Sequence, residues 1–119
     1  MYKIEELKKN ISLLNDVEWD LNPAVAVGRH LEWGAGWACD NYTARGSVDQ
    51  SVYFAISTWE RPVTVYLVKR TGFEMEELAK FILPKQIETR FLKSIGNKNG
   101  MYELDLDVKQ WLKGELDVN

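Results

Sequence analysis

The segment SVYFAISTWERPVTVYLVKRT, residues 51–71, decides the fold of this chain. It consists of two runs rich in β-branched and aromatic residues, with the tripeptide ERP at 60–62 between them. In both runs apolar residues alternate with a period of two, which is typical of β-strands. The connection around Glu60 to Pro62 has a normal length for a hairpin, so we expect the two strands to pair in an antiparallel arrangement.

The alternation also assigns side chains to the two faces of the predicted sheet. One face carries three apolar residues from each run: Val52, Phe54, Ile56, Val63, Val65 and Leu67. Tyr53, Tyr66 and Val68 fall on the opposite face. Because both sets are apolar or aromatic, we expect both sides of the sheet to be partly covered.

The next segment, TGFEMEELAKFILP, fits two periods. Met75, Leu78, Ala79 and Ile82 match a helix, whereas alternation across residues 78–82 matches a strand. We favour a third strand from about Glu77 to Leu83, because a two-stranded ribbon alone is marginally stable. A helix over 74–82 stays open as the alternative.

Helices are predicted on both sides of the strands. Residues 2–14 carry four apolar residues on one helical stripe: Ile4, Leu7, Ile11 and Leu14. Asn22 and Pro23 are typical of a helix start, and Gly34 of a helix end, so 23–33 predicts a largely buried helix near the centre. Pro84 begins another helix, which Gly96 closes before a turn at 97–100, and Asp105 caps the last one. Their inward residues are Ile87, Phe91 and Ile95, and Val108, Trp111, Leu112 and Leu116.

These elements predict one α+β domain spanning residues 1–119. We expect a two- to three-stranded antiparallel meander with about four helices packed around it, because helical segments flank the strands in sequence and do not alternate with them.

Composition excludes several classes of protein. The chain of 119 residues has 15 Lys and Arg against 18 Asp and Glu, a net charge of −3 that argues against a nucleic-acid binder. The single cysteine predicts an intracellular, cytoplasmic protein without a disulfide. The charged N-terminus does not resemble a secretory signal, and no apolar run approaches the roughly 18 residues that cross a bilayer. We therefore expect a soluble protein with no membrane partner.

The residue types that carry most chemistry are scarce. His30 and Cys39 are the only histidine and cysteine, and neither lies in a nucleophile or zinc motif. The stretch NKNGMYELDLD fails as a calcium loop, because Ile95 and Leu106 occupy positions that require acidic ligands. No phosphate-binding or dinucleotide motif occurs. The sequence thus favours a protein without a metal, a cofactor or catalytic residues.

Five tryptophans are the least ordinary feature of the sequence. Trp33 and Trp111 have helical core spacing, and Trp19 lies in a link where it can cover the core. Trp37, which follows Gly36 in the segment LEWGAGW, and Trp59, beside the hairpin connection, are candidates for binding because exposed tryptophans mark interfaces.

Four strings of sequence carry a resemblance to known proteins. They are W-D-x-x-P-x-x-A-V from Trp19, LEWG-x-G-W from Leu31, YF-x-x-x-TW-x-x-P-x-V-Y-L-x-x-R from Tyr53, and LP at Leu83. Over about residues 16–116 the chain resembles a family of small uncharacterised bacterial proteins, similar to hypothetical proteins of sulfate-reducing bacteria. The resemblance implies a compact α+β fold and implies no activity, ligand or catalytic residue.

Two functions remain. The first is a small non-catalytic binding protein that contacts a protein partner or a second copy of itself. The second is a small enzyme or ligand-binding protein with a pocket near the end of the helix 23–33. Its lining would comprise His30, Trp37, Cys39, Asp40 and Arg45. We favour the first, because a catalytic site needs several positioned groups and the sequence pairs none of them.

Overall fold

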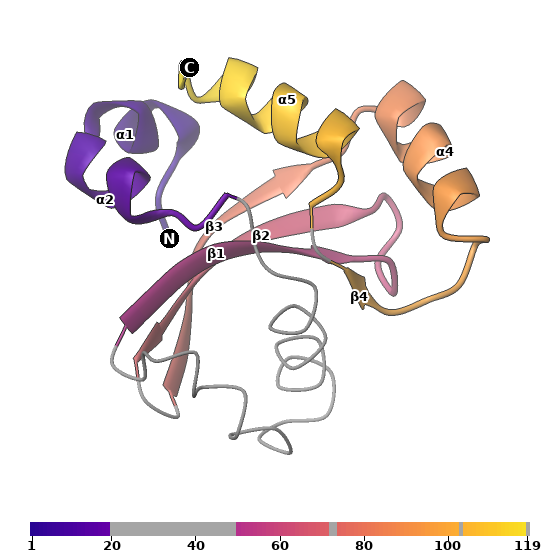
Figure 1. The fold of residues 1–119 in the computed structure, drawn as a ribbon, viewed down its shortest axis with the longest axis horizontal. Coiled ribbons are helices and arrows are strands. Elements are labelled where there is room, and N and C mark those ends of the chain that lie inside the picture. The colour runs from indigo at the N-terminus through magenta and orange to yellow at the C-terminus, as the bar shows by residue number, and fades with distance from the viewer. Residues whose placement is uncertain (20–49, 72–73, 103, 119) are drawn as a thin grey trace.

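The computed structural model describes residues 1–19, 50–71, 74–102 and 104–118. The predicted helix at 23–33 lies outside these ranges. The described elements are a sheet and helices that lie on one side of it, so the predicted α+β architecture is confirmed (Figure 1).

The sheet is an antiparallel meander of three long strands with a short fourth strand at one edge. The strands are β1 (Gln50–Ser57), β2 (Thr64–Thr71), β3 (Glu74–Ile82) and β4 (Met101–Tyr102), in the order β3-β2-β1-β4. The third strand is therefore confirmed, and the helical alternative for 74–82 is wrong. The edge of β1 that pairs with β4 has a second partner: Val17, which follows α2, forms a parallel bridge with Val52.

β3 contains an irregularity that changes which of its side chains face the core. Leu67 pairs with Ala79 and Val68 with Glu77, so Leu78 has no partner in the register and forms a bulge. Simple alternation places Leu78 on the face of Lys80 and Ile82. The extra residue instead lets Leu78 join the main core, while Lys80 and Ile82 stay exposed.

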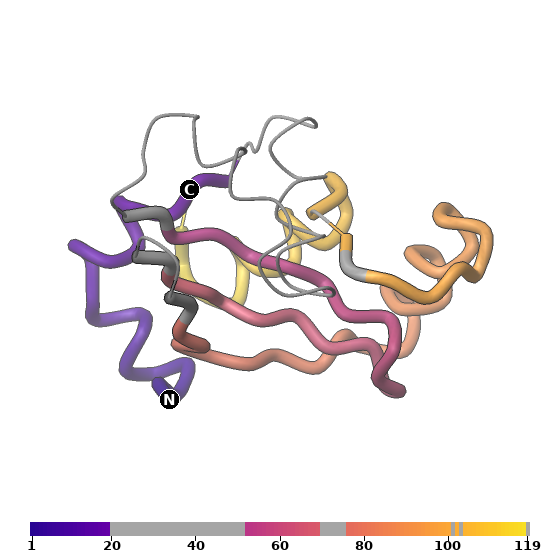
Figure 2. The backbone as a smooth tube through the Cα atoms, turned by 90° about the horizontal axis from the view of Figure 1, so that it is seen from below, coloured from indigo at the N-terminus to yellow at the C-terminus, as the bar shows by residue number. Residues whose placement is uncertain are grey.

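All four helices among the described residues lie on the same side of the sheet (Figures 1 and 2). They are α1 (Ile4–Lys9), α2 (Ile11–Asp16), α4 (Lys85–Ser94) and α5 (Leu106–Glu115). α1 and α2 cover the end of the sheet where β1 starts, and α4 lies toward the opposite end.

Residues 2–14 do not form the continuous helix that their apolar stripe predicts. The chain breaks at Asn10, whose backbone has φ −96° and ψ 74°, and two short helices result. The side chain of Asn10 accepts a hydrogen bond from the backbone N–H of Leu13 at 3.1 Å. Asn10 is thus the N-cap of α2, a role that competes with a position inside a helix.

Both C-terminal helices begin where the sequence predicts, and α4 also ends where Gly96 predicts. α4 follows Pro84, and Gly96 beyond its end has φ +69°, in the left-handed region that favours glycine. The carboxylate of Asp105 accepts a hydrogen bond from the backbone N–H of Val108 at 2.8 Å and caps α5. Arg90 and Asp107 join the two helices through an exposed ion pair at 2.8 Å.

Apolar side chains are buried on both faces of the sheet, as the alternation predicts. The main core lies between the sheet and the helices and includes residues from both: Val52, Phe54, Ile56, Val65, Leu67, Phe81, Leu7, Leu14, Phe91, Val108, Leu112 and Leu116. A second buried cluster on the other face contains Tyr53, Ala55, Tyr66 and Val68. Trp19 packs on Phe54 with ring centroids 5.1 Å apart, and Trp111 is partly buried against the main core, as expected for both.

Candidate functional site

The connection between β1 and β2 presents an exposed tryptophan next to a fully buried threonine. Trp59 is 57% exposed, whereas Thr58 is 0% exposed. The connection lies at the end of the sheet where β4 and the segment leading to it also lie (Figure 1). We call residues 58–62 together with the turn 97–100 the Trp59 corner.

Thr58 joins the two halves of the Trp59 corner. Its backbone N–H donates to the carbonyl of Gly100 at 3.0 Å, and its hydroxyl oxygen accepts from the N–H of Gly100 at 2.7 Å. The hydroxyl hydrogen has two acceptors within reach, the carbonyl oxygens of Gly100 at 3.0 Å and Lys98 at 3.2 Å. A single buried side chain thereby fixes the backbone on which Trp59 is presented.

Arg61 makes a second link across the Trp59 corner. Its Nη1 donates to the carbonyl oxygens of Thr58 and Glu60, the latter at 3.2 Å. Its Nη2 donates to Oδ1 of Asn99 at 3.1 Å. All three acceptors are neutral, so these bonds position the guanidinium and leave its positive charge in place.

The acidic residue beside Trp59 is directed toward the sheet. The hydroxyl of Tyr66 donates to the Glu60 carboxylate at 2.6 Å from Oε1. Burial first, and then this hydrogen bond and the negative charge of Glu60, raise the pKa of Tyr66 well above its usual range, so the phenol stays protonated as a donor. The positive charge of Lys80 also lies close to Tyr66, because its Nζ is 5.9 Å from the centre of the Tyr66 ring.

Sequence reasoning identified only part of this site. Trp59 is the one candidate residue that falls within the described ranges, and its exposure fits the prediction that it lies at the surface. The other candidates lie outside them: His30, Trp37, Cys39, Asp40 and Arg45. The roles of Thr58, Arg61 and Asn99 were missed. No local pattern could reveal them, because their partners are about 40 residues away, at separations of 38 to 42.

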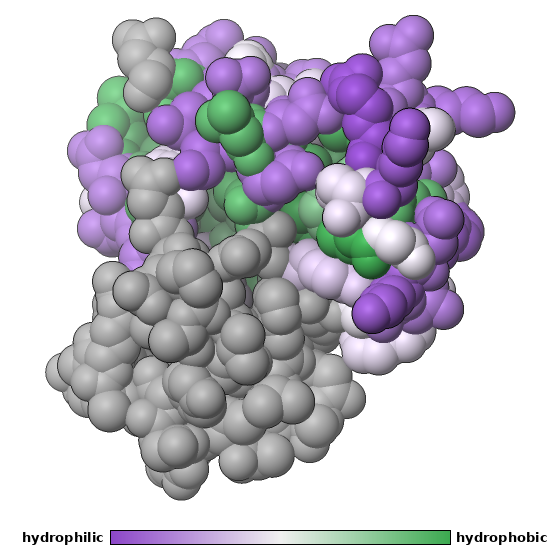
Figure 3. Space-filling view, turned by 45° about the vertical axis from the view of Figure 1, so that its right-hand side comes forward, coloured by the Kyte–Doolittle hydropathy of each residue, from purple (hydrophilic) through white to green (hydrophobic). Residues whose placement is uncertain are grey.

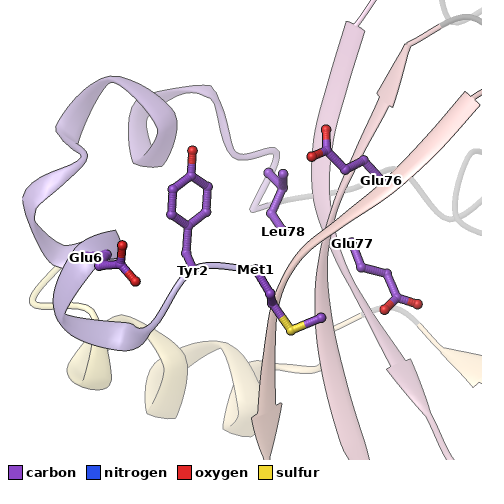
Figure 4. Close-up of a pocket in the computed structure, with 6 residues that line it drawn as sticks. All are labelled: Met1, Tyr2, Glu6, Glu76, Glu77 and Leu78. Carbon is purple, nitrogen blue, oxygen red and sulfur yellow. The ribbon is translucent and has the colours of Figure 1, made fainter.

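A separate cavity of about 290 Å³ lies between the N-terminal segment and β3 (Figure 4). Its lining is mainly acidic and aromatic: Met1, Tyr2, Glu6, Glu76, Glu77 and Leu78. The backbone N–H of Tyr2 donates to the carbonyl of Leu78 at 2.7 Å, which ties the N-terminal segment to the bulge of β3. In Figure 4 the carboxylates of Glu76 and Glu77 point in different directions from β3, and Glu6 lies across the cavity on α1. Over the described ranges, no three His, Cys, Asp or Glu side chains are grouped so that they could hold a metal ion.

The surface near the Trp59 corner is mixed. Figure 3 brings the end of the molecule with α4 and β4 forward, and there hydrophobic residues reach the surface in small areas between hydrophilic ones. A partner on this side would therefore rely on a local anchor more than on a broad apolar patch.

The described elements and this site define a small α+β domain that presents the exposed indole of Trp59 beside a hydrogen-bonded stretch of backbone. Comparison with known proteins adds no relative: no family model, curated protein or solved structure matches the chain. In the part of the chain that the structure describes, no helix has both the length and the apolar character needed to cross a bilayer.

Proposed function

We propose that the protein is a non-catalytic interaction protein that contacts a protein partner through Trp59. The observation that carries the proposal is the contrast between the exposed indole of Trp59 and the buried, hydrogen-bonded Thr58 beside it. Such a contrast supports a binding role, because the backbone that carries the indole is already held and loses little conformational freedom when a partner covers Trp59.

The exposed area is large enough to matter for affinity. Covering an indole that is 57% exposed removes on the order of 100–150 Å² from water. At ~25 cal/mol per Å², this burial contributes about 3 kcal/mol. A contribution of that size is typical of the few residues that dominate protein interfaces, among which tryptophan is enriched.

The test first identifies the partner and then measures its affinity. A photo-crosslinking amino acid at position 59 captures the partner in cells of the source organism, and the same group at Leu106 is the control. The captured protein is purified and titrated by calorimetry with wild type, W59A and L106A. Leu106 is a matched control because it is 67% exposed and lies on α5. Sedimentation velocity of the wild type at 10–500 μM tests a second copy as the partner.

The expected result is a loss of affinity of roughly 30- to 150-fold in W59A, the equivalent of 2–3 kcal/mol. L106A should bind within about twofold of wild type, since isolated surface contacts contribute little. Equal affinity of W59A and wild type for the purified partner, or no partner and no self-association at all, would exclude the proposal.

The alternative function, a ligand pocket built from His30, Trp37, Cys39, Asp40 and Arg45, involves residues outside the described ranges. No contact within those ranges favours it, so the proposal depends on Trp59.

A further inference from the structure

The charges around Trp59 indicate which kind of partner it would accept. We propose that the partner presents an acidic segment, in which an Asp or Glu carboxylate pairs with Arg61 while a neighbouring side chain packs on Trp59. This inference rests on the proposed function and adds the chemistry of the partner to it.

Within the described ranges, the guanidinium of Arg61 is oriented by hydrogen bonds and forms no ion pair. It has five N–H donors, and its hydrogen bonds within the described residues end on the neutral oxygens of Thr58, Glu60 and Asn99. No described residue accepts from its Nε–H or from one of its Nη2 hydrogens, and these two donors can serve a ligand. Arg61 is exposed, and because its hydrogen bonds already hold it in place, little side-chain entropy is lost when a carboxylate binds.

Two carboxylates of the described residues that contact the β1–β2 connection or β2 already accept hydrogen bonds. Glu60 accepts the hydroxyl hydrogen of Tyr66, and Lys80 lies over the same ring. Glu88 Oε2 accepts the backbone N–H of Val63 at 2.6 Å. Both carboxylates keep their negative charge but accept hydrogen bonds from donors of the domain itself, whereas the exposed guanidinium of Arg61 keeps N–H donors that no hydrogen bond within the described residues uses.

A second cation lies in the other half of the Trp59 corner. The carbonyl of Lys98 accepts hydrogen bonds from Thr58 at 3.2 Å and from the Tyr102 hydroxyl at 2.8 Å, so its backbone is fixed against the connection that carries Trp59. The residue itself is exposed. Since the whole chain has a net charge of −3, an acidic segment is repelled by the protein in general and attracted to this basic corner.

The test is a selection of peptides that depend on Trp59. A random 16-residue phage-displayed library is selected on the wild-type protein after removal of all phage that bind W59A. We expect the enriched peptides to contain Asp or Glu next to an aromatic or aliphatic residue. The best peptide is then synthesised in two versions. One version keeps its acidic residues, and in the other every Glu is replaced by Gln and every Asp by Asn. Both versions are measured by fluorescence anisotropy at 50 and 300 mM NaCl.

Replacement of the acidic residues should weaken binding at least tenfold at 50 mM NaCl, and the higher salt should weaken only the acidic version. R61Q should lower affinity for the acidic peptide about tenfold, while R61K, which keeps the charge, should lose less. Because the peptide comparison uses unaltered protein, its result does not depend on the folding of a variant.

Two failures are distinguishable. If Trp59-dependent peptides are enriched but lack acidic residues, or if both versions bind equally, the acidic partner is excluded and the proposed function stands. If no peptide is enriched on the wild type over W59A, both the acidic partner and the role of Trp59 in binding fail.

Discussion

Thr58→Val is the substitution that best tests how the Trp59 corner is held together. Valine has nearly the shape of threonine and no hydroxyl, so the packing of this fully buried residue is kept while its side-chain hydrogen bonds are lost. In T58V the carbonyl of Gly100 still accepts a hydrogen bond from the backbone N–H of residue 58, and the carbonyl of Lys98 still accepts one from the Tyr102 hydroxyl. The N–H of Gly100 loses the acceptor that it had at 2.7 Å.

The magnitude follows from that single unpaired donor. A fully buried N–H without an acceptor costs about 1–3 kcal/mol; because the bond to Gly100 is part-buried, T58V should lower the free energy of unfolding by the lower part of this range, about 1–2 kcal/mol. With a urea dependence of ~2 kcal/mol per M, the unfolding midpoint should fall by roughly 0.5–1 M. Hydrogen exchange should show faster exchange at the amide of Gly100 than in wild type, because its protection depends on the Thr58 hydroxyl.

Thr89→Val is the matched control. Thr89 lies exposed on α4, and its hydroxyl donates to the carbonyl of Lys85 at 2.9 Å. The same loss of a hydroxyl at this exposed position should change stability by no more than about 0.5 kcal/mol. The reasoning is refuted if T58V unfolds at the midpoint of T89V and the amide of Gly100 keeps its wild-type protection.

Two further groups of substitutions test the hydrogen bond between Tyr66 and Glu60 and the N-cap of α5. The raised pKa of Tyr66 means that the native protein keeps a phenol proton that the unfolded chain releases near pH 10, so stability is fully present below pH ~10 and falls as the pH rises further. Y66F should flatten this fall when urea unfolding is measured between pH 8 and 11, and E60Q should flatten it in part. Replacement of the α5 cap in D105A removes the acceptor of the Val108 N–H and should cost about 1 kcal/mol, while D105N, which can still cap, should cost a few tenths when measured by urea unfolding.

The sequence predicts those elements whose cause is local. The strands follow from side-chain alternation, and α5 follows from the cap at Asp105, because each signal lies within a few residues of its effect. The break at Asn10 is local too, but the apolar stripe continues across it and favours one helix. The bulge at Leu78 and the pairing of β4 depend on partner strands, and the local pattern does not contain this information.

The candidate site is divided in the same way. The sequence predicts Trp59 as a binding residue, because a tryptophan beside a hairpin connection can be exposed. The sequence does not predict the groups that hold its backbone, because Thr58 and Arg61 form hydrogen bonds with Gly100 and Asn99, far along the chain. Only a structure shows that a polar turn and a hairpin connection form one unit.

This unit makes a further consequence of T58V testable. If Thr58 contributes only to stability, T58V should bind the partner or the selected acidic peptide as wild type does whenever the protein is folded. If Thr58 presets the position of Trp59, T58V should bind more weakly although residue 58 is fully buried and out of reach of a partner at the surface. The loss should come mainly as faster dissociation, because preorganisation and close contact act after the charged groups have met. Equal dissociation rates for folded T58V and wild type would show that the indole needs no such support, and that the exposure of Trp59 alone accounts for binding.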